Sequence, residues 1–401
     1  MPVDPALTPS PAPGPAPDID PAPDLDPGSA PDPGSAPNPG SAPDPGSAPA
    51  FRPEIAARLP LVQHLDSFAG APAGTFEEWT ADYGPAETWD LMVEDRDLPG
   101  PHGRVPVRIY TPEGLVPDGG RPVLVWIHGG SFMHGDLDMP EADDVARGVA
   151  GRADAVVVSV FYRLVDEPAT WADAKPAPNS EGDRGVHAPI PLDDVMAAVR
   201  WSVDHARELG GDPDRIAVGG ASAGGNLAAA TALRAPTEDI ALALSLPIYP
   251  ALHGALPEPT EEEARALAGV PLPLRFPPPV YQEMSENYLG RPLAEATAFE
   301  FPALATREQL ATVPPTYLEI SEFDDLRVSG DRYAAQLREA GVEVELVLRR
   351  GVPHGHLNRR GLAAAGETMD AIAERLRGCD QGLGCEGRAL GPARRRSLAV
   401  E

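Results

Sequence analysis

A serine flanked by glycines offers the most direct chemistry in this sequence. Gly220-Ala221-Ser222-Ala223-Gly224 stands between a short apolar run, 215–219, and a helix-forming run, 223–234. A G-x-S-x-G sequence between a strand and a helix predicts a tight, strained turn, because glycine tolerates backbone conformations and close approaches that other residues do not. Such a turn leaves the hydroxyl of Ser222 exposed as a nucleophile, with the next backbone N–H pointing into the same space.

A serine hydroxyl is a useful nucleophile only when a base lies within hydrogen-bonding reach and a third group orients that base. Residues 316–321 and 342–348 read as neighbouring strands, and Asp324 and His354 follow them closely. Both side chains should therefore emerge at the carboxyl edge of the sheet, facing the serine. We expect Ser222, Asp324 and His354 to form a catalytic triad.

Other titratable residues compete for two of these roles. Glu322 and Asp325 also follow the first of the two strands, and His356 follows the second. The order of serine, acid and histidine along the chain supports a triad, and within it we favour Asp324 and His354.

Consecutive glycines at the end of an early strand predict a site for a developing negative charge. The sequence of residues 126–132 is Trp-Ile-His-Gly-Gly-Ser-Phe. Its backbone can bend so that N–H groups point at an oxyanion, and each such donor is worth about 2.7–4 kcal/mol in the transition state. We expect the donors to be Gly129, Gly130 and Ala223. His128 is expected to position the loop rather than act as a base.

Strand-like and helix-like runs alternate along most of the chain. Strands are expected at 105–110, 123–128, 155–162, 216–219, 240–248, 316–321 and 342–348, and helices at 141–150, 192–209, 223–234, 329–340 and 360–377. Several strands are continuous apolar runs, as in sheets covered on both faces. The alternation predicts an α/β fold with a mostly parallel central sheet and helices on both faces.

Two regions depart from this alternation, and both ends of the chain have a different character. Residues 1–50 form a Pro/Gly/Ser/Ala-rich repeat that we expect to be a disordered tail. Residues 51–378 are expected to form one domain, with helices in 51–80 and 252–312 forming a cap over the serine. Residues 379–401 are expected to be a flexible tail.

Composition excludes some classes of protein. The formal charge of −29 at pH 7 disfavours nucleic acid and anionic membrane as partners, and no apolar run is long enough to span a membrane. The first residues lack the basic and apolar segments of a signal peptide, so we expect a cytoplasmic location. Two cysteines, Cys379 and Cys385, do not make a disulfide scaffold.

Taken together, the motifs resemble the hormone-sensitive lipase family of α/β-hydrolases, in its bacterial esterase branch. The likeness runs in order from about residue 85 to 378. It rests on segments similar to HGGG, its following GDLD, DYRLAPE, GGDSAGGN, DPLR and HGF, which lie at 128–132, 135–138, 161–168, 219–226, 324–327 and 354–355. The sequence departs from the family's pattern at Ser131, Phe161 and Ala221, and none of these positions belongs to the triad.

The resemblance implies an α/β-hydrolase fold with a helical cap, and two-step hydrolysis of short- to medium-chain carboxylic esters. It implies no metal and no organic cofactor, a small-molecule ester as substrate, and leaves a homodimer open. An amidase or peptidase with the same triad is an alternative, as is a catalytically dead homologue that binds a ligand. Phe132, Tyr162 and Tyr288 are candidates to line the substrate pocket.

Overall fold

The computed structural model describes residues 50–171, 174–179 and 185–378. By its contacts the chain divides into two units, Met1–Ala48 and Pro49–Glu401, and all described residues belong to the second. Outside the described residues lie the expected N-terminal tail up to residue 49, the expected C-terminal tail 379–401, and both cysteines, Cys379 and Cys385.

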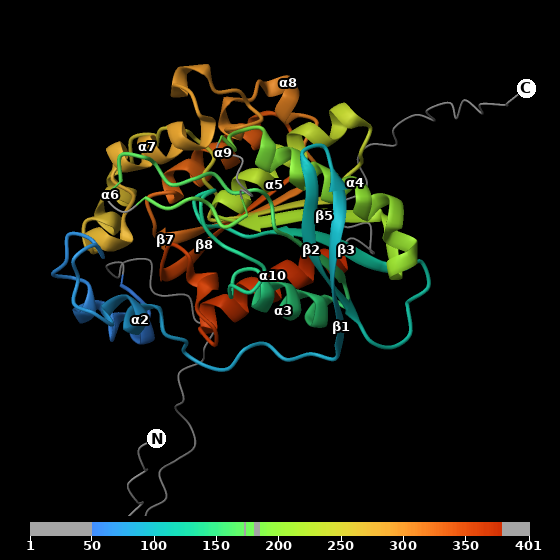
Figure 1. Ribbon diagram of the computed structural model, residues 1–401, viewed down its shortest axis with the longest axis horizontal. Coiled ribbons are helices and arrows are strands. Elements are labelled where there is room, and N and C mark those ends of the chain that lie inside the picture. The colour runs from blue at the N-terminus through green and yellow to red at the C-terminus, as the bar shows by residue number, and fades with distance from the viewer. Residues whose placement is uncertain (1–49, 172–173, 180–184, 379–401) are drawn as a thin grey trace, which may run out of the picture. The chain divides into compact units, whose positions relative to one another are not determined.

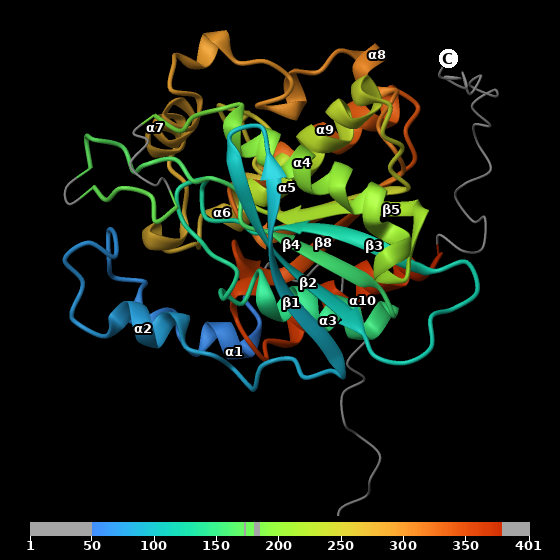
Figure 2. The ribbon, with the colours of Figure 1, turned by 45° about the vertical axis from the view of Figure 1, so that its right-hand side comes forward.

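Within the described residues, eight strands form one sheet in the order β1-β2-β4-β3-β5-β6-β7-β8 (Figures 1 and 2). The strands are β1 (Leu91–Gly100), β2 (Gly103–Pro112), β3 (Arg121–Ile127), β4 (Val156–Val160), β5 (Gly211–Ala221), β6 (Leu244–Ile248), β7 (Thr316–Phe323) and β8 (Val344–Pro353). β2 pairs antiparallel with β1 and with β4, and the other neighbours pair parallel. The expectation of a mostly parallel sheet is confirmed.

Helices cover both faces of the sheet, as expected. They are α3 (Asp143–Ala153) and α10 (Ala363–Gly378) on one face, and α4 (Ile190–His205), α5 (Ala223–Arg234) and α9 (Arg327–Glu339) on the other (Figure 1). Alternate side chains of β3 serve the two layers: Val123 and Val125 pack toward α4 and α5, whereas Leu124 and Trp126 pack toward α3 and α10. This alternation explains why the central strands read as continuous apolar runs.

The expected element boundaries differ from the observed ones mainly at strand ends. Strand β8 runs to Pro353, so it ends directly before His354. The strand expected at 240–248 is shorter, because only Leu244–Ile248 pair in β6. β1 was not anticipated; it is an edge strand whose residues are mostly exposed, and its charged sequence does not read as a buried strand.

Short helices lie in the two regions expected to form a cap. Residues 51–80, where helices are expected, hold α1 (Pro53–Ala56), a 3-10 turn at Leu59–Leu61, and α2 (Thr75–Thr80). Residues 252–312 hold α6 (Glu261–Leu267), α7 (Pro278–Leu289) and α8 (Arg307–Leu310), and the helical pieces expected near α6 and α7 are present. No helix in the described part of the chain is both long and apolar enough to cross a membrane.

Candidate active site

Ser222 occupies a strained turn between β5 and α5. Its backbone has φ 57° and ψ −118°, which a residue with a side chain rarely adopts. Glycine is required on both sides because space is absent: a Cβ on Gly220 would lie 2.4 Å from the carbonyl oxygen of Gly224, and a Cβ on Gly224 would lie 2.1 Å from that of Ile127. The turn is held by a hydrogen bond from the Ser222 N–H to the carbonyl oxygen of Ile248, at 2.9 Å.

The structure brings the three residues of the expected triad into one hydrogen-bonded line. Nε2 of His354 lies 2.9 Å from Oγ of Ser222, and Nδ1 of His354 lies 2.7 Å from Oδ2 of Asp324. The carboxylate of Asp324 is fully buried, and its other oxygen accepts the N–H of Leu326 at 2.9 Å. Ser222 is 7% exposed, and it lines the cavity beside it.

The competing acids and the second histidine have other partners. Asp325 accepts two hydrogen bonds from the guanidinium of Arg275, at 2.7 and 2.8 Å. Glu322 accepts the N–H of Gly351 at 2.7 Å. His356 is buried 2.9 Å from the hydroxyl of Thr368. None of these side chains reaches Ser222.

Opposing influences set the pKa of His354. Burial disfavours the imidazolium and lowers the pKa, but the carboxylate of Asp324 opposes this through its charge and its hydrogen bond. The more distant charges of Glu141 and Asp325 add to that effect, and the net pKa lies above the usual value of 6.5. The rings of Tyr249 and Phe276 pack edge-on against the imidazole, with centroids 5.0 and 4.9 Å away.

The loop after β3 has a buried carboxylate behind it. The N–H of Gly129 donates to Oε2 of Glu141 at 2.6 Å, so this N–H is committed and does not face the space above Ser222, contrary to the expectation. The N–H groups of Gly130, Ser131 and Ala223 have no acceptor among the residues that the structure describes. Gly130 and Ser131 both have positive φ, and Ser131 lines the cavity beside Ser222.

His128 lies inside the fold behind this loop. Burial lowers its pKa to about 4, so the ring is neutral near pH 7. Its Nδ1 lies 2.7 Å from the carbonyl oxygen of Gly129, and its ring stacks on that of Tyr162 with centroids 4.7 Å apart. These contacts fit the expected loop-positioning role.

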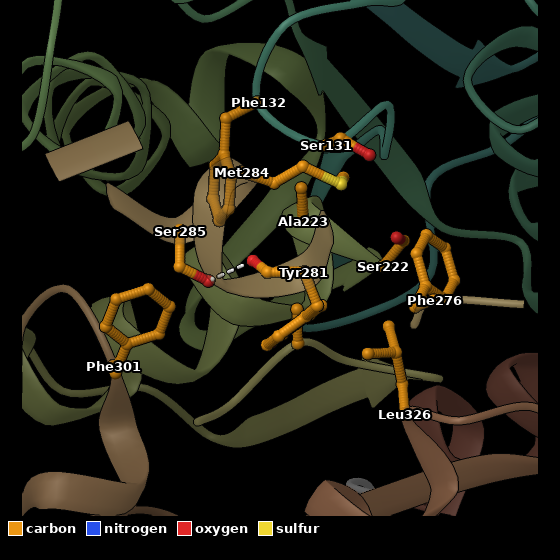
Figure 3. A pocket seen from close by; sticks show the side chains of 11 residues that line it. Ser131, Phe132, Ser222, Ala223, Phe276, Tyr281, Met284, Ser285, Phe301 and Leu326 are labelled. Atoms are coloured by element: carbon orange, nitrogen blue, oxygen red, sulfur yellow. Dashed lines mark hydrogen bonds between the residues drawn. The ribbon is translucent and has the colours of Figure 1, made fainter. Parts of the chain in front are cut away.

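A narrow cavity of about 20 Å³ opens beside Ser222 (Figure 3). Of the three expected lining residues, only Phe132 lines it. Tyr288 is fully buried and stacks behind Phe132, with ring centroids 3.8 Å apart. Tyr162 is also fully buried, and its hydroxyl donates to the carbonyl oxygen of His128 at 3.1 Å. Both tyrosines support the walls from outside.

Sequence reasoning did not identify most of the residues that line the cavity beside Ser222. Residues that line the cavity and were not anticipated include Phe276, Tyr281, Met284, Ser285, Phe301 and Leu326. Three of them, Tyr281, Met284 and Ser285, lie on α7, and Figure 3 shows the ring of Phe276 beside the hydroxyl of Ser222. The helix was anticipated, but its pattern did not show which of its faces meets the serine.

The sequence is similar to those of known protein families. A model of the α/β-hydrolase fold family matches residues 185–358, and one of the carboxylesterase family matches residues 106–243. Esterase LipI of Mycobacterium tuberculosis is 33% identical over 281 residues, which are 69% of this chain and 78% of that protein. The chain belongs to the hormone-sensitive lipase-like family of α/β-hydrolase esterases.

Other esterases are similar over comparable lengths. Carboxylesterase NlhH of Mycobacterium tuberculosis is 34% identical over 279 residues, covering 67% of this chain and 76% of that protein. The solved structure of a hyperthermophilic esterase from Pyrobaculum calidifontis is 27% identical with a TM-score of 0.64, covering 82% of this chain and 99% of that one. The family resemblance drawn from the motifs is thus confirmed.

Proposed function

We propose that this protein, a carboxylic ester hydrolase by its family, cleaves short- to medium-chain esters through Ser222, His354 and Asp324. The observation that carries the proposal is the line of hydrogen bonds from Ser222 to His354 to Asp324, at 2.9 and 2.7 Å. In a serine esterase these lengths suit proton transfer between hydroxyl and imidazole.

Hydrolysis takes place in two steps. Oγ of Ser222 bonds to the ester carbonyl carbon while its proton passes to Nε2 of His354. The bond to the alcohol oxygen then breaks, and His354 returns the proton to the departing alcohol. Water repeats the sequence on the acyl-enzyme, with His354 as base, and releases the acid. Asp324 holds the imidazole tautomer and stabilises its cation.

The oxyanion of each tetrahedral intermediate is placed at the N–H groups of Gly130, Ser131 and Ala223. These groups are free of other acceptors among the described residues, whereas the N–H of Gly129 is held by Glu141. Ser131 contributes its backbone N–H here, so the serine in place of the family's third glycine is compatible with the function.

The narrow cavity beside Ser222 is the acyl site in this proposal, because it is lined by Ser222 together with Ser131 and Ala223. A volume of about 20 Å³ has room for little more than an acetyl group, since about one water needs 10–15 Å³ on the same measure. Longer acyl chains then require Met284 and its neighbours to move. We therefore expect turnover to fall from acetate to hexanoate esters.

The test is labelling and turnover. Fluorophosphonate should modify the wild-type protein on Ser222, and Ser222→Ala should abolish both labelling and hydrolysis of 4-nitrophenyl acetate. Ser67→Ala is the matched control, because Ser67 is exposed and does not line the cavity. Equal hydrolysis by Ser222→Ala would overturn the proposal. Faster cleavage of an anilide than of the ester with the same acyl group would favour the amidase alternative.

The expected cytoplasmic location stays a prediction. The expectation that no metal or organic cofactor takes part also stays a prediction, and a homodimer stays open.

A further inference from the structure

A second and much larger cavity, of about 530 Å³, shares Phe276 with the narrow one. Phe276 lines both cavities, Ser222 lines the narrow one, and His354 lines the large one. A leaving alcohol receives its proton from the histidine, so it departs on the histidine's side. If the proposed function holds, on which this inference rests, the large cavity receives the alcohol part of the ester.

The wall of this cavity is strongly aromatic. Trp79 is 4% exposed, and Phe68 and Phe76 meet edge to face with ring centroids 5.1 Å apart. Phe76 remains 53% exposed, at the cavity's edge. Aromatic walls of this kind favour a flat, apolar group, because offset and edge-on ring contacts add to the gain from burial.

One guanidinium on this wall makes no ion pair with any acidic residue in the described part of the chain. Arg359 lines the cavity, and within the described residues its only direct polar contact is a long one, 3.5 Å, to the carbonyl oxygen of Asn358. Its guanidinium lies over the ring of Trp79, 5.9 Å from the centroid. Burial lowers the pKa of Arg359 and the nearby cation of Arg58 adds to this, whereas the charges of Tyr83, Asp82 and Tyr249 act in the opposite direction. A partly desolvated cation of this kind gains from an anion.

The other charged groups of the wall are already paired. The guanidinium of Arg275 donates two hydrogen bonds to the carboxylate of Asp325. The acidic residue of the lining is Asp82, which is half-exposed, and its carboxylate lies 3.9 Å from the guanidinium of Arg360. Among the described residues of this wall, Arg359 is therefore the charged side chain without an ion-paired partner, and Asp82 acts on it only from beyond ion-pair distance.

We propose that the large cavity selects esters whose alcohol part carries an aromatic ring and an anionic group, with Arg359 binding the anion. The matching substrate class is the short-chain acyl ester of a hydroxylated aromatic acid. The ring packs among Trp79, Phe76 and Phe276, and the carboxylate meets the planar fork of the guanidinium.

The experiment compares two esters of the same shape and different charge, 4-acetoxybenzoate and 4-acetoxybenzamide. We expect the wild-type protein to favour the anionic ester in kcat/KM, and Arg359→Gln to lower kcat/KM for it about ten-fold while changing the neutral ester less than about three-fold. Arg359→Lys should retain part of the preference, because it keeps the charge and loses the fork.

The matched control is Arg104→Gln. Arg104 is another arginine on the same protein, its side chain is 82% exposed, and it does not line the cavity. The Arg104→Gln variant removes the same charge, and it should leave the ratio of kcat/KM for the two esters unchanged. A charge-reversed variant, Arg359→Glu, should invert the ratio in favour of the neutral ester.

Equal turnover of both esters by the wild-type protein, unaltered by Arg359→Gln, would overturn the inference and leave the proposed function intact. Failure to hydrolyse any ester would count against the proposed function instead. If Arg359→Gln does not fold, inhibition of the wild-type enzyme decides: 4-hydroxybenzoate should inhibit hydrolysis of 4-nitrophenyl acetate about ten-fold more strongly than 4-hydroxybenzamide. Equal inhibition would contradict the role of Arg359.

Discussion

Oε2 of Glu141 accepts the N–H of Gly129 at 2.6 Å, and both residues are buried. The other carboxylate oxygen accepts the hydroxyl of Tyr249 at 2.7 Å, and Tyr249 packs edge-on against His354. The indole N–H of Trp126 anchors the backbone of Glu141 at 2.7 Å. One buried carboxylate thus holds both the start of the loop after β3 and a ring that packs against His354.

Substitution of Glu141 should separate geometry from charge. Glu141→Gln keeps an acceptor for Gly129, so we expect kcat to fall less than about ten-fold, with the acid limb of the pH profile moving to lower pH because a charge that raises the pKa of His354 is gone. Glu141→Ala also frees the loop, and should lower kcat about 10²–10³-fold, comparable to the loss of one oxyanion donor.

Steady-state kinetics across pH checks this expectation, with KM and kcat resolved separately. A loss confined to KM in Glu141→Ala, with kcat unchanged, would contradict a role in positioning the oxyanion loop. An unmoved acid limb in Glu141→Gln would contradict the electrostatic part.

The pH dependence of kcat/KM should report His354. The imidazole must be neutral to accept the serine proton, and its pKa is raised above 6.5, so activity should fall as pH drops through a midpoint above 6.5. An acid limb centred below pH 6 in the wild-type protein would be inconsistent with the Asp324 contact.

Asp324→Asn should lower kcat about 10⁴-fold.

The raised pKa of His354 also makes the stability of the fold depend on pH. A folded-state pKa above the unfolded value stabilises the fold below the unfolded pKa, and this contribution disappears as pH rises through the folded pKa. Urea denaturation of the wild-type protein and of His354→Ala at several pH values would show whether their difference shrinks toward alkaline pH.

The width of the acyl cavity should depend on Met284. Met284→Ala removes a side chain from the wall, so turnover of hexanoate relative to acetate should rise about ten-fold. Gln282→Ala, on the same helix but exposed and outside the cavity, should leave this ratio unchanged. A series of 4-nitrophenyl esters measures it, and an unaltered chain-length profile in Met284→Ala would show that the acyl group lies elsewhere.

Gly224 should tolerate no side chain. A Cβ there would lie 2.1 Å from the carbonyl oxygen of Ile127, inside the packed contact of α5 and β3, so Gly224→Ala should destabilise the fold by about 1–3 kcal/mol and abolish activity. Gly366→Ala is the matched control: Gly366 lies in α10 with no atom within 4 Å of an added Cβ, and the change should stabilise by about 0.5–1 kcal/mol. Thermal denaturation compares the two variants.

The sequence alone identified the three residues of the hydrogen-bonded line, because each directly follows a recognisable strand. Ser222 lies between two glycines that the turn requires, and Asp324 and His354 follow β7 and β8, whose apolar patterns are clear. Parallel strands bring their carboxyl ends to one edge without any information on side-chain packing.

The rest of the site depends on packing that a single sequence does not reveal. Glu141 reads as an ordinary polar residue at the start of an expected helix, and only the fold places its carboxylate behind Gly129. Tyr162 and Tyr288 are of a residue type that often lines a pocket. Both are fully buried, however, and neither lines the cavity beside Ser222. Arg359 belongs to the same group, because only the three-dimensional structure shows that no acidic residue among those described forms an ion pair with it.

Phe276 stands at the border of the two cavities, and its backbone N–H is held by Asp325, the residue directly after Asp324. A single ring thus forms part of both the proposed acyl cavity and the proposed alcohol cavity. Under this proposal, selectivity for the acid half of an ester and selectivity for its alcohol half are coupled through Phe276. Directed evolution toward a bulkier acid that acts through this position will alter the preferred alcohol in the same round.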